Sequence, residues 1–363
     1  MAENKKILLV IDALNSGGAQ RQLVGLAKLL KDKGYTVRVI SYIDLPFYKS
    51  FLDENEVDNK CVIAGGPVKP DYLMVYGAIK EDIKSFKPDI VISYLVFPCI
   101  ITSLIHRKDK SFKLIVSERN TTQKLDWLER FKFWTYRWAD VIVPNSHSQE
   151  RFIKSNYPKY SDKLVTITNF VDTDTFVPVE ERVDNPVPVL LSVGRVMRQK
   201  NVLKYQKVLK RLKDDGIKFK ALWYGSERDP YFKECAENRK VLELGKVFEF
   251  KGRVKDMVDV YQKADIFCLP SIYEGYPNVL CEAMCCGLPV VASDVCDNPD
   301  IVEPSCGMLF NPFDEDDMYL KLKTMLTSPQ EEWSAMGKAS SDISKVKFSR
   351  SEFVEKYESI WNG

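Results

Sequence analysis

The chain has 363 residues, of which 45% are hydrophobic and 29% charged, and its formal net charge is +2. This length allows two domains with a core each, and the composition excludes a disordered or fibrous protein. The nine cysteines lack paired spacing and there are only two histidines, so we expect no disulfide framework, no metal site and a reducing cytosol as the environment.

The N-terminal residues Met1 to Lys6 are charged and lead into an apolar run, a pattern unlike that of a signal peptide. The longest apolar stretch, residues 89–106, approaches membrane-spanning length. Pro98 divides it, however, and serines and threonines interrupt it. We therefore expect a buried strand followed by a helix, in a soluble protein.

The first half of the chain alternates between apolar runs and helical segments. Residues 19–31 have helical periodicity and are followed by Lys33-Gly34, a helix-stop signal. Strands are predicted at residues 7–11, 36–42, 89–95, 113–117, 140–144 and 164–168. This alternation predicts a parallel, doubly wound α/β sheet.

The alternation restarts after residues 176–188, which are rich in Pro and charge and are predicted to be a linker. We therefore expect two Rossmann-like domains, residues 1–175 and 189–347, with a ligand-binding cleft at the carboxyl ends of their strands. The strands of the second sheet are predicted at residues 189–193, 220–224, 247–250, 266–269 and 290–292.

The most informative motif is the segment from Glu274 to Glu282, in which two carboxylates flank the turn Gly275-Tyr276-Pro277-Asn278. Asn278 is expected to be the N-cap of a helix whose first N–H groups bind an anion. Carboxylates repel phosphate, so Glu274 and Glu282 are expected to bind hydroxyl groups beside it. A diphosphate flanked by sugar hydroxyls indicates a nucleotide sugar.

Two further loops follow the first strand of each domain. Gly194-Arg195, with Lys200 five residues after Arg195, places two cations where a diphosphate could bind, although a solvated basic loop has the same pattern. Gly17-Gly18 lets the backbone approach a ligand at a helix N-terminus, or simply forms a tight turn. The dinucleotide fingerprint spacing is absent, so Asp44 supports an NAD site only weakly.

Two features of the first domain could serve an acceptor or a membrane. Glu118, in Ser117-Glu118-Arg119-Asn120, is placed to orient or deprotonate an acceptor hydroxyl, or to form an ion pair with Arg119. Residues 124–138 predict a basic amphipathic helix that lies on a membrane or packs on its own sheet, and residues 107–163 hold roughly twice as many basic as acidic residues. The expected membrane contacts are Trp127, Phe131, Trp134, Trp138 and Lys132.

Together these motifs resemble the retaining GT-B-fold glycosyltransferases of family 4, over most of the chain. The features that carry the resemblance are E-x7-E (Glu274, Glu282), Gly194-Arg195 with Lys200-Asn201, the segment from Asn169 to Pro178, and the Gly17 loop. Ser-Glu-Arg-Asn is similar to the subgroup of N-acetylhexosaminyltransferases that act on lipid-linked oligosaccharides, where other members often have a His in place of Glu118. The C-terminal residues 348–363 are similar to the helix that returns to the first domain.

The resemblance implies that Arg195 and Lys200 hold the diphosphate, that Glu274 binds the donor sugar and that Glu282 binds the ribose. It implies a nucleotide-binding role for Gly17, Gly18, Gly194, Gly225, Arg253, Val254, Gly275, Tyr276, Pro277, Asn278 and Val279. The expected reaction is metal-independent, retaining transfer from a UDP-sugar co-substrate to a glycan, without a cofactor.

The acceptor expected from the resemblance is linked to polyprenyl diphosphate, in surface polysaccharide or glycan synthesis on the cytoplasmic side of the membrane. No nucleic-acid motif is present. Two alternatives remain open at this point. One is a nucleotide-sugar epimerase of the same fold, and the other is a binding protein that keeps the nucleotide site without turnover.

Overall fold

The structure, a computed structural model, describes residues 5–63, 70–119, 121–180 and 185–362. The chain forms two compact units. The first consists of Met1–Asn169 together with Ser351–Gly363, and the second of Phe170–Arg350. The expected linker, residues 176–188, therefore belongs to the second unit, as do residues 170–175. Residues 181–184 of that linker and Asn120 lie outside the described residues.

The first unit is built on a six-stranded parallel sheet in the order β3-β2-β1-β4-β5-β6. This is the order of a doubly wound fold, in which the direction of winding reverses between β1 and β4. Its strands are β1 Lys6–Val10, β2 Thr36–Ser41, β3 Asp58–Cys61, β4 Ile90–Tyr94, β5 Lys113–Glu118 and β6 Val141–Pro144.

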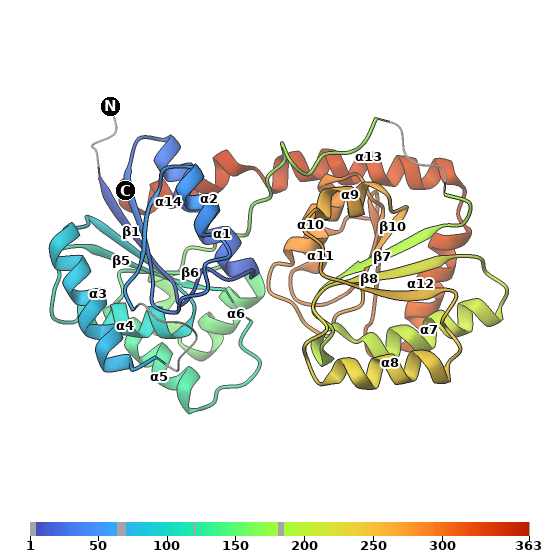
Figure 1. The fold of residues 1–363 in the computed structure, drawn as a ribbon, viewed down its shortest axis with the longest axis horizontal. Helices are drawn as coiled ribbons and strands as arrows, with labels where there is room; N and C mark the ends of the chain where they lie inside the picture. The colour runs from blue at the N-terminus through green and yellow to red at the C-terminus, as the bar shows by residue number, and fades with distance from the viewer. Residues whose placement is uncertain (1–4, 64–69, 120, 181–184, 363) are drawn as a thin grey trace. The chain divides into compact units, whose positions relative to one another are not determined.

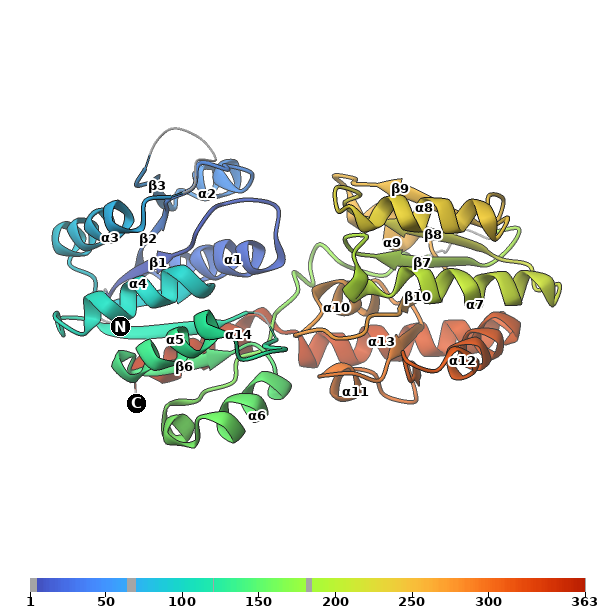
Figure 2. The ribbon, with the colours of Figure 1, turned by 90° about the horizontal axis from the view of Figure 1, so that it is seen from below.

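Helices cover both faces of this sheet (Figures 1 and 2). On one face, α3, α4 and α5 pack against the sheet residues Leu8, Val91 and Leu114 in a single apolar core. Helix α14 belongs to this unit although it is the last element of the chain. The helices are α1 Gly18–Asp32, α2 Lys49–Glu54, α3 Tyr72–Phe86, α4 Val96–His106, α5 Trp127–Thr135, α6 His147–Asn156 and α14 Arg350–Asn362, with 3-10 helices η1 Tyr136–Trp138 and η2 Pro158–Lys163.

The second unit repeats this architecture with a parallel sheet in the order β12-β11-β10-β7-β8-β9. Its strands are β7 Val189–Val193, β8 Lys220–Tyr224, β9 Phe248–Gly252, β10 Ile266–Leu269, β11 Val290–Ser293 and β12 Gly307–Phe310. Counted within the unit, the strand order is the same as in the first, and the winding reverses between β7 and β10.

In the second unit, helices α7, α8 and α12 pack on one face of the sheet, and α10 and α13 on the other (Figure 1). Two cores therefore enclose the strands. The helices are α7 Val202–Asp214, α8 Tyr231–Val241, α9 Met257–Gln262, α10 Asn278–Cys285, α11 Asn298–Ile301, α12 Glu315–Thr327 and α13 Gln330–Lys347, with the 3-10 helix η3 Arg198–Lys200.

Most predicted strands are confirmed, but one is wrong and two were missed. Residues 164–168 form no strand, since only Leu164 is bridged to Ile142. The missed strands β3 and β12 are the outer strands of their sheets. The apolar stretch 89–106 is a buried strand and a helix, as expected. Within the described ranges, no helix combines the length and the apolar character needed to cross a bilayer.

Candidate active site

The predicted donor-binding loops follow the carboxyl ends of neighbouring strands in the second unit. The Gly194 loop follows β7 and the Glu274 loop follows β10, and these two strands flank the point where the winding reverses. Gly225 follows β8, and Arg253 follows β9. The carboxyl edge at a reversal point is where open α/β sheets bind ligands. The sheet order thus brings together loops that lie up to 80 residues apart.

The ammonium group of Lys200 and the carboxylate of Glu274 form an ion pair across these two loops. Their side chains are 13% and 9% exposed. Ser271 donates a hydrogen bond of 2.6 Å to the same carboxylate oxygen, Oε1. Gln199 connects the two loops by two further hydrogen bonds. Its side-chain Nε2 donates to the Tyr273 carbonyl at 2.8 Å, and its backbone carbonyl accepts from the Ile272 N–H at 2.8 Å. The pair is therefore held in place while part of each side chain stays open to a ligand.

Gly194 and Gly225 allow the loops that follow β7 and β8 to approach each other closely. The Gly194 N–H donates to the Tyr224 carbonyl at 2.8 Å, and its carbonyl accepts from the Trp223 indole at 2.8 Å. A Cβ on Gly225 would overlap the carbonyl oxygen of Gly194. A Cβ on Gly194 would lie 2.9 Å from Cε of Lys200. Gly194 thus leaves room for the side chain of Lys200, and Gly225 leaves room for the backbone of Gly194.

Helix α10 begins at Asn278, so the N-cap is Pro277 and the expectation of an Asn278 cap is wrong. Proline fixes its own backbone and leaves the cap without a side-chain acceptor, while the Pro277 carbonyl accepts from Leu280 and Cys281. Glu282, on this helix, is 2% exposed and accepts a hydrogen bond of 2.9 Å from the hydroxyl of Tyr261. Tyr261 was not predicted, since nothing in its local pattern marks it.

The remaining donor-loop residues differ in exposure. Arg195, Arg253 and Val254 are exposed, whereas Tyr276 is only 8% exposed and packs edge-on to Phe348. Gly275, Asn278 and Val279 are half-buried. An exposed Arg195 beside the Lys200–Glu274 pair is suitably placed to meet an incoming anion.

In the first unit, Gly17 and Gly18 lie between β1 and α1, and Gly18 is the first residue of the helix. Asp12, which the sequence did not single out, lies at the start of this loop. Its Oδ1 accepts hydrogen bonds from the Ala13 N–H at 2.7 Å and from Gln20 Nε2 at 3.3 Å. Burial raises the pKa of Asp12, although these hydrogen bonds act against it.

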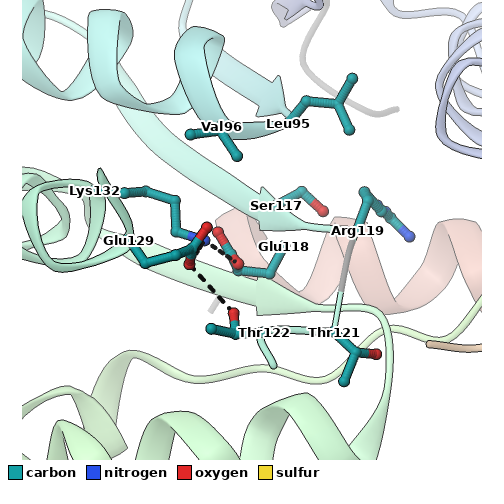
Figure 3. Close-up of a pocket in the computed structure, with 9 residues that line it drawn as sticks. All are labelled: Leu95, Val96, Ser117, Glu118, Arg119, Thr121, Thr122, Glu129 and Lys132. Atoms are coloured by element: carbon teal, nitrogen blue, oxygen red, sulfur yellow. Dashed lines mark hydrogen bonds and ion pairs between the residues drawn. The ribbon is translucent and has the colours of Figure 1, made fainter. Parts of the chain in front are cut away.

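Glu118 ends β5 and lies at the centre of a buried polar network (Figure 3). Its Oε2 is 2.7 Å from Lys132 Nζ and 3.4 Å from Gln149 Nε2, and its Oε1 accepts a hydrogen bond from Tyr136. Lys132 also contacts Glu129 Oε2 at 2.7 Å. None of these partners was predicted, because they come from α5, η1 and α6, far along the chain.

Arg119 points away from Glu118, so the predicted alternative of a Glu118–Arg119 ion pair is wrong (Figure 3). Its guanidinium is buried and donates to Asn169 Oδ1 at 3.0 Å, to the Tyr357 hydroxyl at 2.7 Å and to the Tyr94 hydroxyl. It also lies 4.1 Å from the centre of the Tyr94 ring. Arg119 therefore binds α14 to β4 and has a structural role.

The predicted amphipathic helix spans Trp127–Thr135 and continues as η1. Trp127 is 78% exposed, Phe131 39% and Trp134 40%, whereas Trp138 is half-buried against Trp134. Lys132 is only 2% exposed and faces Glu118, so its expected membrane contact is wrong. The reason is geometric: Lys132 lies on the inner face of α5.

No cluster of three or more His, Cys, Asp or Glu side chains in the described ranges is arranged to hold a metal ion. The nine cysteines are free thiols. Metal independence of the reaction stays an expectation at this point.

Two parallel sheets of one strand order, with a Lys–Glu ion pair at the reversal point of the second, agree with the expected GT-B fold of a glycosyltransferase. The profile of the family described as "Glycosyl transferases group 1" matches residues 175–342, and that of "Glycosyltransferase Family 4" matches residues 16–175. The chain therefore belongs to the group 1, family 4 glycosyltransferases.

Known relatives and structures agree with this placement. An N-acetylgalactosamine-N,N'-diacetylbacillosaminyl-diphospho-undecaprenol 4-alpha-N-acetylgalactosaminyltransferase of Campylobacter jejuni is 26% identical, over 95% of this chain and 98% of its own. A second C. jejuni alpha-1,4-N-acetyl-D-galactosaminyltransferase, acting on a diNAcBac-PP-undecaprenol glycan, is 28% identical over 77% of this chain and 76% of its own. The structure of Anabaena HepE with UDP and glucose has a TM-score of 0.85, 17% identity and coverage of 99% and 100% of the two chains.

Proposed function

We propose that this glycosyltransferase moves an N-acetylhexosamine or hexose, with retained anomeric configuration, from a UDP-sugar to a glycan linked to polyprenyl diphosphate. The assignment of a UDP-sugar donor rests on the Lys200–Glu274 ion pair between the loops that follow β7 and β10. Relatives described as acting on undecaprenyl-diphosphate glycans support the acceptor. The structure of HepE with UDP and glucose supports the donor.

In this proposal the second unit binds the donor. Arg195 and Lys200 neutralise the diphosphate without a metal ion, Glu274 binds sugar hydroxyls and Glu282 binds the ribose. The acceptor oxygen forms a bond to the anomeric carbon on the same face of the sugar on which the bond from that carbon to the diphosphate oxygen breaks, so the configuration is retained. UDP leaves with the bonding electrons, and the hydroxyl proton is released. Electrostatic stabilisation of the departing diphosphate is the main contribution of the two cations.

The donor assignment is tested by ligand-induced stabilisation followed by turnover. A ligand that binds the folded state alone raises the melting temperature by mass action. We expect UDP-GalNAc, UDP-GlcNAc or UDP-glucose to raise it more than the matching GDP- and ADP-sugars. Radiolabel from the stabilising donor should then reach polyprenyl-diphosphate-linked N-acetylgalactosamine. Absence of any shift contradicts the donor assignment, and conversion of the donor without acceptor would indicate the epimerase instead.

The exposed aromatic face of α5 supports peripheral contact with the cytoplasmic face of the membrane. Trp127, Phe131 and Trp134 lie on this face, with the exposed cations Arg130 and Arg137 beside them. Phe131 and Trp134 stack with ring centres 5.7 Å apart. Apolar rings flanked by cations are typical of a helix in the interface of an anionic membrane. This location brings the enzyme to an acceptor whose lipid is in the bilayer.

Replacing Trp127 and Trp134 together with alanine should weaken binding to phosphatidylglycerol-containing vesicles by at least about tenfold, because each ring removed from water contributes ~1.5–3 kcal/mol. Vesicle sedimentation measures this binding. Phe313→Ala is the control, since Phe313 is 67% exposed in the second unit. Wild-type binding should fall with added salt. Equal binding of both variants, or no wild-type binding at low salt, contradicts the membrane contact.

A further inference from the structure

The network around Glu118 contains a largely buried cluster of three charged side chains. Lys132 lies between two carboxylates, at 2.7 Å from an oxygen of Glu118 and 2.7 Å from an oxygen of Glu129. Its side chain is 2% exposed, as against 5% for Glu118 and 19% for Glu129. Buried charges are costly, and replacing such a group with apolar residues often stabilises a protein. A buried charge beside a pocket therefore points to a functional role.

The hydrogen bonds to Glu118 leave room for one more donor. A carboxylate offers about four acceptor positions. Lys132 and Gln149 donate to Oε2, and Tyr136 donates to Oε1. One position on Oε1 is thus available within this set of contacts. Because its other positions are filled from three different elements, the carboxylate cannot rotate without breaking them.

Glu118, Glu129, Lys132 and Arg119 line a cavity of about 40 Å³, together with Ser117, Thr121 and Thr122 (Figure 3). The cavity has room for a group of about the size of a water molecule, such as one sugar hydroxyl. Leu95, which also lines it, has φ of +75° and ψ of 168°, a conformation that is strained for a bulky residue. Strain of this kind gathers at functional sites, where the surrounding structure maintains it.

Tyr136 and Cys99, which lie near Glu118, are neutral near pH 7. Burial, with Cys99 and Glu118 close by, holds the pKa of Tyr136 well above its ordinary value. Burial and then Glu118 raise the pKa of the Cys99 thiol to about 12. Burial alone would lower the pKa of Lys132, but Glu118 and Glu129 outweigh it and the pKa is raised. Arg119 also lines the cavity, but its guanidinium donates to Asn169, Tyr94 and Tyr357. Lys132 is therefore the cation that pairs with Glu118, and Glu129 is the second carboxylate beside it.

We propose that Lys132 is a positioning residue for sugar transfer: it holds Glu118 as an oriented carboxylate whose remaining Oε1 position accepts a hydrogen bond from a hydroxyl or amide N–H of the acceptor sugar. This inference rests on the proposed function and deepens it, because it assigns acceptor recognition to one carboxylate. It also defines the acceptor group chemically, because the group that binds at this oxygen is a neutral hydrogen-bond donor.

The test compares Lys132→Met with Lys154→Met, using the labelled UDP-sugar and polyprenyl-diphosphate-linked N-acetylgalactosamine. Lys154 is a matched control, since it pairs with Glu150 at 2.6 Å in the same unit but is 50% exposed. For Lys132→Met we expect kcat/KM for the acceptor to fall about 100-fold, the scale of a misplaced reacting group. The stabilisation by UDP should stay as in the wild type, because the donor residues lie in the other unit.

The comparison of donor and acceptor kinetics separates positioning from a structural role. In Lys132→Met, KM for the UDP-sugar should stay near the wild-type value while kcat/KM for the acceptor falls, because only the orientation of Glu118 is lost. Both parameters should stay in place in Lys154→Met. If Lys132→Met transfers sugar like Lys154→Met, or if its donor and acceptor parameters fall alike, the positioning role is wrong.

Tyr136→Phe keeps the test decisive if Lys132→Met does not fold. It removes only the hydroxyl that donates to Oε1, and loss of one hydrogen bond to a charged group corresponds to about a tenfold fall in kcat/KM for the acceptor. Unchanged acceptor kinetics in Tyr136→Phe contradict the inference. A wild-type chain that binds no nucleotide sugar contradicts the proposed function itself, a result seen before any acceptor is added.

Discussion

Glu274→Gln is expected to lower kcat for sugar transfer by about 10³-fold while UDP still stabilises the protein. The carboxylate of Glu274 is paired with Lys200 and accepts a hydrogen bond from Ser271. Glutamine has nearly the same size, but it cannot keep the ion pair and turns an NH₂ group toward the Lys200 ammonium or the sugar. Loss of one preorganised charged partner in an active site lowers kcat by about 10²–10³-fold. Initial rates of transfer at saturating donor and acceptor measure the effect.

The control for this prediction is Glu234→Gln. Glu234 pairs with Arg198 at 2.9 Å in the same unit, and its side chain is 47% exposed. Exposed ion pairs contribute about 0–1 kcal/mol, so this variant should keep its activity and stability. An activity of Glu274→Gln within about threefold of the wild type would show that Glu274 has no part in transfer.

Arg119→Met is expected to lower the free energy of unfolding of the first unit by about 3 kcal/mol. The guanidinium joins Asn169, Tyr357 and Tyr94, and its removal leaves these buried polar groups without their charged donor. The stacking of Arg119 over the Tyr94 ring is lost as well. Because the two units can unfold separately, urea denaturation should be combined with amide hydrogen exchange of residues 351–362.

Arg137→Met is the matched control, since Arg137 also lies over an aromatic ring, at 5.2 Å from the centre of Trp134, but is exposed. Arg137→Met should lower the free energy of unfolding by no more than about 1 kcal/mol. Amide hydrogen exchange in α14 should be faster in Arg119→Met than in the wild type, and unchanged in Arg137→Met. Equal stabilities of the two variants would mean that Arg119 does not secure α14.

The strands that the sequence predicts well are those buried on both faces. Mostly apolar runs such as residues 7–11 and 189–193 lie at the centre of their sheets, where both faces are covered. Strand β3 has the sequence Asp-Asn-Lys-Cys and lies at an edge, where polar side chains reach solvent, so it carries no apolar signal. Conversely, residues 164–168 are rich in β-branched residues, yet only Leu164 is bridged to the sheet.

The sequence alone indicates that the predicted donor-binding loops lie together, but it does not indicate the partners of Glu118. Gly194, Lys200 and Glu274 lie in loops next to apolar strands, so the strand positions alone indicate that the loops share one edge. The partners of Glu118 depend instead on how α5 is rotated about its axis. The aromatic pattern gives the outer face of that helix, but it does not show that Lys132 points inward.

The helix α14 makes the first unit discontinuous in sequence, and this has a consequence for synthesis. Arg119 and Tyr94 are made early, yet their partner Tyr357 leaves the ribosome only after the whole second unit. The second unit is one continuous segment, so it is able to finish folding first, against the usual order in which N-terminal domains fold first. Until then the nascent first unit exposes the surface that α14 covers, which makes this interval the stage at which a chaperone would be needed most.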